Sequence, residues 1–170
     1  MICMNFFLAG LSVLAGVYLS YRLTSKFPRR EKGLKTLYND ISKLENYVCY
    51  YQESLIIALR KIEGDYAEFF RFISQSMENC NAADIRRTWA SGMEQYTAFS
   101  FLNNTDKECI LDFAELLGKS DSQSQKQLFK SVKKQLEERL LESKQESSHN
   151  VRMYRILGFV AGIALAIIII

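Results

Sequence analysis

The fold of this chain can be predicted most directly from the stretch LKTLYNDISKLENYVCYY, residues 34–51. Apolar side chains recur there at steps of three or four residues, from Leu34 through Ile41 to Val48, and polar side chains fill most positions between them. In a helix this spacing gathers the apolar side chains on one face. The stretch therefore predicts an amphipathic helix that packs against a core.

Shorter apolar stripes follow on the C-terminal side. Residues 55–62 and residues 66–73 each carry one, and Gly64 separates them. They predict two helices of about three turns each. Asn81 is placed to cap a further helix that carries Trp89.

Two capping boxes, in which a Ser or Thr is followed three residues later by Glu or Gln, mark later helix starts. Thr105 with Glu108 precedes an apolar stripe that ends at Gly118, a residue type that commonly stops helices. Ser120 with Gln123 precedes another stripe, formed by Leu128, Phe129, Val132, Leu136 and Leu140. We therefore expect one helix to start at each box.

The last helix allows two interpretations. No Gly or Pro occurs between Ser120 and Gly158, so a single helix can continue to the chain end. The polar segment 142–150 contains Ser147, Ser148 and Asn150, whose side chains compete for backbone hydrogen bonds. A local break in that segment is the alternative.

These segments together define the expected fold class. No stretch alternates convincingly between apolar and polar residues, as a half-buried strand does. About six helices within residues 22–150 are enough to bury one core. The sequence predicts an all-α protein: a compact bundle of about six helices, flanked by an N-terminal and a C-terminal transmembrane helix.

Residues 1–21 carry no charged side chain and are long enough, at about 20 residues, to cross a bilayer as a helix. The nearest basic residues, Arg22, Lys26, Arg29 and Arg30, come after this segment. A cleaved secretory leader, which is the alternative, has its basic residues before the apolar run. We therefore interpret residues 1–21 as a transmembrane helix whose C-terminal end faces the cytoplasm.

Residues 151–170 form the second predicted membrane helix. Their uncharged part starts at Ile156 and is short for a hydrocarbon core of about 30 Å. It spans the bilayer if Arg152 and Arg155 extend their charged ends back to the interface, and the alternative is insertion without full crossing. Both arginines precede the apolar end, which again predicts a cytoplasmic position for residues 22–150.

Small residues are regularly spaced in both tails. Gly158 and Gly162 lie four residues apart, and Ser12 and Gly16 stand in the same relation. Such spacing lets two helix backbones approach closely in a membrane. One interpretation is that the tails pack on each other or on a partner. The other is chance, because Gly is common in membrane helices.

Metal-binding and redox motifs are absent from the sequence. Its single histidine is His149, and no two cysteines form the close pair that a zinc site requires; the cysteines are Cys3, Cys49, Cys80 and Cys109. In a cytoplasmic domain we expect them to be reduced thiols, with Cys3 as an exception near the outer face.

Phosphate and nucleic-acid binding are also not indicated. The triplet Gly118-Lys119-Ser120 resembles the end of a phosphate-binding loop, but the first Gly and the strand of that motif are missing. A net charge of +3, dispersed along the chain, is too small for a nucleic-acid surface. We therefore expect a non-enzymatic protein with no catalytic residues, no metal, no cofactor and no nucleic-acid partner.

Two single residues need a partner or a buried position. Glu45 falls close to the apolar face of its helix, where a carboxylate is costly unless it is paired. An ion pair or a partner contact is favoured over a catalytic role, because no second catalytic group has a defined spacing from it. Trp89 belongs to the core or anchors a partner, and the core is the commoner position.

The whole chain resembles the stage III sporulation protein AB family of endospore-forming bacteria. The resemblance rests on the order of its motifs: the apolar N-terminal helix, Leu44-Glu45, Val48, Tyr50, Leu55, Ala58, Leu59, Trp89, Leu117-Gly118-Lys119-Ser120-Asp121 with Gln125, Tyr154-Arg155 and Leu157-Gly158. One departure is Ser54, where the family usually has Pro. Either residue suits the start of a helix, and Ser can cap it.

The resemblance implies a platform or scaffold in the secretion-like channel between mother cell and forespore. The family's soluble domain is similar to the cytoplasmic helical domain of platform proteins in type II secretion and type IV pilus machines. It implies an ATPase partner similar to stage III sporulation protein AA, the other stage III channel proteins as further partners, and the outer forespore membrane as location, with residues 22–150 in the mother-cell cytoplasm. Candidate partner-contact or structural residues are Glu45, Leu117, Gly118, Ser120, Asp121 and Gln125.

Two other functions remain open at this point. The chain is either a plain membrane tether that recruits one cytoplasmic protein without a secretion role, or a membrane-bound enzyme whose catalytic residues have no familiar spacing. We expect the central domain to be a monomer or a small homo-oligomer.

Overall fold

The computed structural model describes residues 10–11, 14–18, 20–22, 24–79, 85–117 and 122–169. The chain divides into two compact units: a central unit, Lys32–Leu141, and a terminal unit made of Met1–Glu31 together with Glu142–Ile170.

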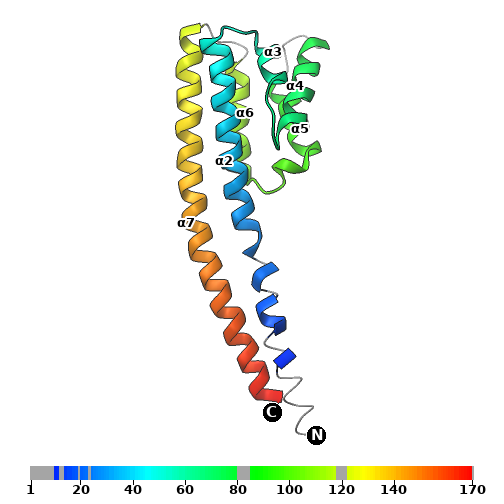
Figure 1. Ribbon diagram of the computed structural model, residues 1–170, viewed down its shortest axis with the longest axis vertical. Coiled ribbons are helices and arrows are strands. Elements are labelled where there is room, and N and C mark those ends of the chain that lie inside the picture. The colour runs from blue at the N-terminus through cyan, green and yellow to red at the C-terminus, as the bar shows by residue number, and fades with distance from the viewer. Residues whose placement is uncertain are drawn as a thin grey trace. The chain divides into compact units, whose positions relative to one another are not determined.

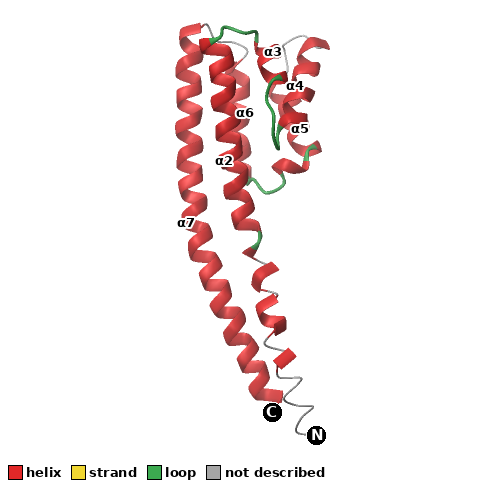
Figure 2. Ribbon diagram, viewed as in Figure 1, coloured by secondary structure: helices red, strands yellow, loops and turns green. Residues whose placement is uncertain are grey.

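All the regular structure in the described residues is helical, and no strand occurs among them (Figure 2). The elements with assigned bounds, labelled as in Figure 1, are α2 (Lys26–Glu45), the π-helix η1 (Asn46–Tyr50), α3 (Leu55–Arg60), α4 (Ala67–Asn79), α5 (Ile85–Gln95), the 3-10 helix η3 (Thr97–Phe99), α6 (Asn104–Leu117) and α7 (Ser122–Ile169). The prediction of an all-α protein with about six helices is confirmed.

Helix α2 contributes one wall of the central core. Its buried face consists of Leu34, Leu37, Ile41 and Leu44, each fully buried, at the spacing that predicts the helix. The α-helical part ends at Glu45, and the predicted helix continues as η1, in which the hydrogen bonds reach one residue further. The amide of Tyr51 donates to the carbonyl of Asn46 in this pattern.

Helices α3, α4 and α5 pack in sequence beside α6 within the central unit (Figure 1). Helix α3 has six residues and is shorter than predicted, because the amide of Lys61 turns back to the carbonyl of Ala58. Gly64 separates α3 from α4 as expected, at a φ of 131° that side-chain-bearing residues rarely adopt. The predicted cap at Asn81 lies outside the described residues.

Aromatic rings fill the centre of this unit. Trp89 on α5 is 1% exposed and meets Phe69 edge-on at 5.3 Å between ring centroids. It also meets Phe113 of α6, whose ring contacts Phe129 of α7 at 5.3 Å. Trp89 is therefore a core residue, which decides between the two interpretations of this position.

The start of α6 is capped differently from the prediction. The side chain of Asn103 accepts a hydrogen bond from the amide of Asp106, and the carboxylate of Asp106 accepts one from the amide of Asn103. This reciprocal pair has the geometry of a capping box two residues before the expected one. The predicted box at Thr105 and Glu108 is wrong because Glu108 instead binds Arg86.

Helix α7 is continuous from Ser122 to Ile169. The alternative of a break in residues 142–150 is therefore wrong. The predicted cap at Ser120 lies outside the described residues. In the described part of the chain, no helix has both the length and the hydropathy needed to cross a membrane. The two flanking membrane helices stay predictions.

Candidate docking site

The central unit has a hollow of about 830 Å³ beside the loop that joins η1 to α3. Residues from both ends of this loop and from the first turn of α7 line it; they are Val48, Cys49, Gln52, Glu53, Ser54, Leu55, Gln125 and Lys126. A second hollow of about 310 Å³ is lined by Lys43, Asn46, Tyr47, Tyr51 and Glu53. Glu53 thus lines both.

The backbone of this loop is set by three residues in succession. Gln52 has a φ of 55°, in the left-handed region. The next amide, that of Glu53, donates to the carbonyl of Tyr47 and turns the chain back toward η1. Ser54 is extended at a φ of −62° and makes no side-chain cap bond, so the expected Ser cap is wrong. Its φ is close to the value that proline imposes, so a Pro at this position would fit the same backbone conformation.

The two carboxylate oxygens of Glu53 differ in their hydrogen bonding. Its Oε1 lies 2.6 Å from Nζ of Lys61, which also lies 5.4 Å from the ring centroid of Tyr47. Its Oε2 is buried and receives no hydrogen bond from any described residue. A buried acceptor in this state favours a donor supplied from outside the chain.

Two tyrosines project from the surface at this site. Tyr50 is 72% exposed and Tyr51 is 70% exposed, although the chain places most other aromatic rings of the central unit in the core. Nζ of Lys126 lies 5.9 Å from the ring centroid of Tyr50. Exposed tyrosines around a hollow are typical of protein-binding surfaces.

Polar contacts join α2 to α7 within the central unit. Lys133 donates to Glu45, and both side chains are mostly buried, at 25% and 15% exposed. This hydrogen bond raises the pKa of Lys133 above its ordinary value of 10.5. Tyr38 donates to Glu137 over 2.8 Å, which raises the pKa of Tyr38. Glu45 is therefore held in an ion pair.

The remaining candidate partner-contact residues lie in different parts of the molecule. Gln125 lines the larger hollow, whereas Leu117 is 3% exposed and belongs to the core. Gly118, Ser120 and Asp121 lie outside the described residues.

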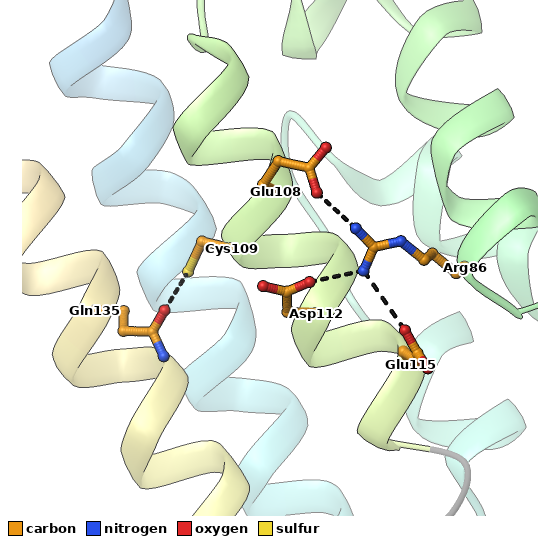
Figure 3. Close-up of polar contacts among 6 residues, drawn as sticks. All are labelled: Arg86, Glu108, Cys109, Asp112, Glu115 and Gln135. Carbon is orange, nitrogen blue, oxygen red and sulfur yellow. Dashed lines mark hydrogen bonds and ion pairs between the residues drawn. The ribbon is translucent and has the colours of Figure 1, made fainter.

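The cysteines of the central unit that the structure describes are free thiols. Burial raises the pKa of Cys49, and it raises the pKa of Cys109 to about 11. Sγ of Cys109 donates to Oε1 of Gln135 over 3.4 Å (Figure 3). Cys3 and Cys80 lie outside the described residues. No group of three or more His, Cys, Asp or Glu within the described ranges can hold a metal ion.

Arg86 fastens α5 to α6 at the surface. Its guanidinium donates to Glu108 and to Asp112, each over 2.6 Å, and Glu115 lies 3.5 Å away (Figure 3). The hydrogen bond to Asp112 raises the pKa of Arg86. This network joins α5 to the acidic face of α6, and none of its residues lines either hollow.

Close backbone contact defines the terminal unit. A β-carbon added to Gly16 would lie 2.6 Å from the carbonyl oxygen of Gly158 and 3.4 Å from Cα of Gly162. Oγ of Ser20 donates to the carbonyl of Tyr154 over 2.8 Å. Small residues thus place the two segments of this unit backbone to backbone.

A buried arginine lies in the same unit. The side chain of Arg30 is 8% exposed, and it donates to Glu146 over 2.6 Å and lies 3.7 Å from Glu142. Glu142 and Glu146 are one turn apart on α7, so a single guanidinium reaches both.

Sequence reasoning missed Gln52, Glu53 and Tyr51 as residues of the hollows. The signal that could have found them is the aromatic and polar stretch 47–54, which breaks the apolar period and still holds three tyrosines. Nothing in the residue types indicates the left-handed φ of Gln52.

These features define the class of the molecule as an all-helical protein with a surface hollow lined by polar side chains. The chain belongs to the stage III sporulation protein AB family, whose sequence profile matches residues 5–170. It is 23% identical over 162 residues to stage III sporulation protein AB of Bacillus subtilis strain 168, covering 92% of this chain and 94% of that protein. No solved structure matches the chain. The family resemblance is confirmed, and it gives the chain a role in sporulation.

Proposed function

We propose that this chain is a non-enzymatic platform of the channel between mother cell and forespore. It holds a cytoplasmic ATPase similar to stage III sporulation protein AA beside the membrane components of that channel. Family membership supports the sporulation role. The hollow lined by Glu53, with Tyr50 and Tyr51 exposed beside it, supports docking of a protein.

The observation that carries the proposal is the outer surface of the terminal unit. Large apolar side chains are exposed there, at 39% to 70%: Leu11, Leu14, Val17, Tyr18, Tyr21, Met153, Ile156, Leu157, Phe159, Val160, Ile163 and Ile167. Many large exposed apolar side chains within one unit favour binding of a partner or of lipid. In this proposal lipid covers them, and both terminal segments lie in the outer forespore membrane.

The orientation follows from charge. Arg22, Arg29 and Arg30 follow the first apolar segment, and Arg152 and Arg155 precede the second. In the sequence, these basic residues lie between each apolar segment and the central unit, which favours a central unit in the mother-cell cytoplasm.

Sporulating cells provide the test. We expect the full chain to remain in the membrane pellet after alkaline carbonate extraction, and to co-purify with the ATPase in mild detergent. Deletion of the chain stops spore development after engulfment, and the purified chain hydrolyses no nucleotide. Normal sporulation in the deletion strain, or co-purification without the ATPase, contradicts the proposal.

A further inference from the structure

The first turns of α7 carry a row of lysines with no acidic residue between them. Residues 122–134 contain Lys126, Lys130, Lys133 and Lys134 and no Asp or Glu. On a helix, steps of four, seven and eight residues from Lys126 fall within about 100° of arc. The four lysines therefore share one side of α7.

Three of these lysines are not neutralised. Lys133 pairs with Glu45. Lys126, Lys130 and Lys134 are exposed, and no carboxylate of a described residue forms an ion pair with any of them. Around the hollow, by contrast, Glu53 is paired with Lys61. The uncompensated charge of this surface is thus positive, and it is concentrated along α7.

The row of lysines is continuous with the candidate docking site. Lys126 lines the larger hollow and stands over the ring of Tyr50. A segment that has one end in the hollow therefore lies beside Lys126 there. Continuing along α7, it passes Lys130 and Lys134, each about one helical turn further on.

We propose that an acidic segment of a partner protein binds along Lys126, Lys130 and Lys134, with one end in the hollow beside Glu53. The inference rests on the proposed docking function and names the chemistry of the docked segment. Charge complementarity selects an acidic occupant, because carboxylates on the partner neutralise three cations that no described carboxylate pairs with. Inside the hollow, a neutral donor of the segment, such as a hydroxyl or a backbone amide, satisfies Oε2 of Glu53.

The first experiment measures binding to a defined probe. The full chain in uncharged detergent micelles is titrated calorimetrically with a 12-residue peptide of alternating Glu and Ala, and with its Gln counterpart. We expect binding of the Glu peptide only, weakening between 50 and 200 mM salt. The variant Lys126→Gln, Lys130→Gln, Lys134→Gln loses about tenfold in affinity, as three exposed ion pairs allow.

A matched variant controls for net charge. Lys32→Gln, Lys35→Gln, Lys107→Gln removes the same charge from lysines on α2 and α6. We expect its affinity to stay within about twofold of the wild type. An equal loss in both variants, or no loss in the first, overturns the proposal.

Other occupants are separated by competition. Vesicles of phosphatidylglycerol and a 20-base-pair DNA duplex are added to the peptide complex, with each of the two lysine variants in parallel. Stronger binding of either competitor than of the peptide, dependent on the same three lysines, assigns the surface to lipid or nucleic acid and overturns an acidic protein segment.

Co-purification from sporulating cells distinguishes the two proposals. Loss of the ATPase from the Lys126, Lys130, Lys134 variant, with retention by the matched variant, supports the inference. Retention by both contradicts the inference and leaves the docking function standing. Absence of the ATPase from the wild-type complex contradicts the docking function itself.

Discussion

Gly16 lies so close to Gly158 that a β-carbon on Gly16 would stand 2.6 Å from the carbonyl oxygen of Gly158. That distance is below any ordinary contact, and the obstructing atom belongs to the backbone. Even the smallest side chain at Gly16 therefore forces the two segments of the terminal unit apart.

Gly16→Ala is the direct test of this contact. We expect a loss of about 1 to 2 kcal/mol, because overpacking outweighs the better helix propensity of Ala. The measurement is thermal unfolding of the full chain in detergent, followed by circular dichroism. Gly10→Ala is the matched control, since a β-carbon there meets no atom within 4 Å. Equal melting of the two variants would show that the close contact contributes nothing.

Arg30→Met should also destabilise the terminal unit. The substitution leaves Glu142 and Glu146 without the guanidinium that they share. Both carboxylates are about half exposed, so water partly compensates, and we expect a loss of about 1 to 3 kcal/mol. Lys35→Met changes the same charge at an exposed position of α2 and should melt within about 0.5 kcal/mol of the wild type. A wild-type melting curve for Arg30→Met argues against the ion pairs.

Cys109 should make stability depend on pH in the alkaline range. Burial raises its pKa from 9.0 to about 11, so the folded state keeps the thiol proton that the unfolded chain releases near pH 9. The contribution is complete below pH 9 and is lost as pH rises from 9 to 11, about 2 to 3 kcal/mol in all.

The check is chemical denaturation of the wild type and Cys109→Ala at several pH values. The wild type should lose more stability than Cys109→Ala between pH 9 and 11. Cys49→Ala keeps the buried thiol of Cys109, so its stability profile should follow that of the wild type more closely than the profile of Cys109→Ala does. Parallel profiles for the wild type and Cys109→Ala would refute the assignment.

Gln52→Gly should stabilise the loop that shapes the hollow. At a φ of 55°, a side chain costs about 1 to 2 kcal/mol, and Gly avoids this cost while adding chain entropy to the unfolded state. We expect a net gain of about 0.5 to 1 kcal/mol in denaturant unfolding. Gln52→Val, with a branched β-carbon, should lose stability. The opposite order would mean that the left-handed conformation is not maintained in solution.

The helices could be predicted because the apolar residues within each one recur at steps of three or four. The face of α2 from Leu34 to Leu44 is read from spacing alone, and burial of these residues follows from it. The start of α6 could not be chosen this way. Asn103 with Asp106 and Thr105 with Glu108 both have a suitable spacing, and the contact of Glu108 with Arg86 on another helix decides between them.

The hollows depend on contacts that no local pattern contains. Glu53 and Lys61 are eight residues apart and form an ion pair. The pair lies next to a turn in which Gln52 has a left-handed φ and the amide of Glu53 donates back to Tyr47. Gln125 reaches the same hollow from α7. Of these residues, the sequence singles out only Gln125 as a candidate for partner contact. It does so through the family resemblance and not through the chemistry of its side chain.

The position of the only tryptophan gives the molecule a built-in optical reporter. Trp89 is shielded from water in the central unit, and its Nε1 has no acceptor among the described residues. Its intrinsic emission should therefore lie at short wavelength and shift to the red only when the central unit opens. The terminal unit contains no tryptophan, so its unfolding does not by itself change the tryptophan emission. Emission and ellipticity recorded on one sample would thus reveal whether the two units lose their structure together or in separate steps.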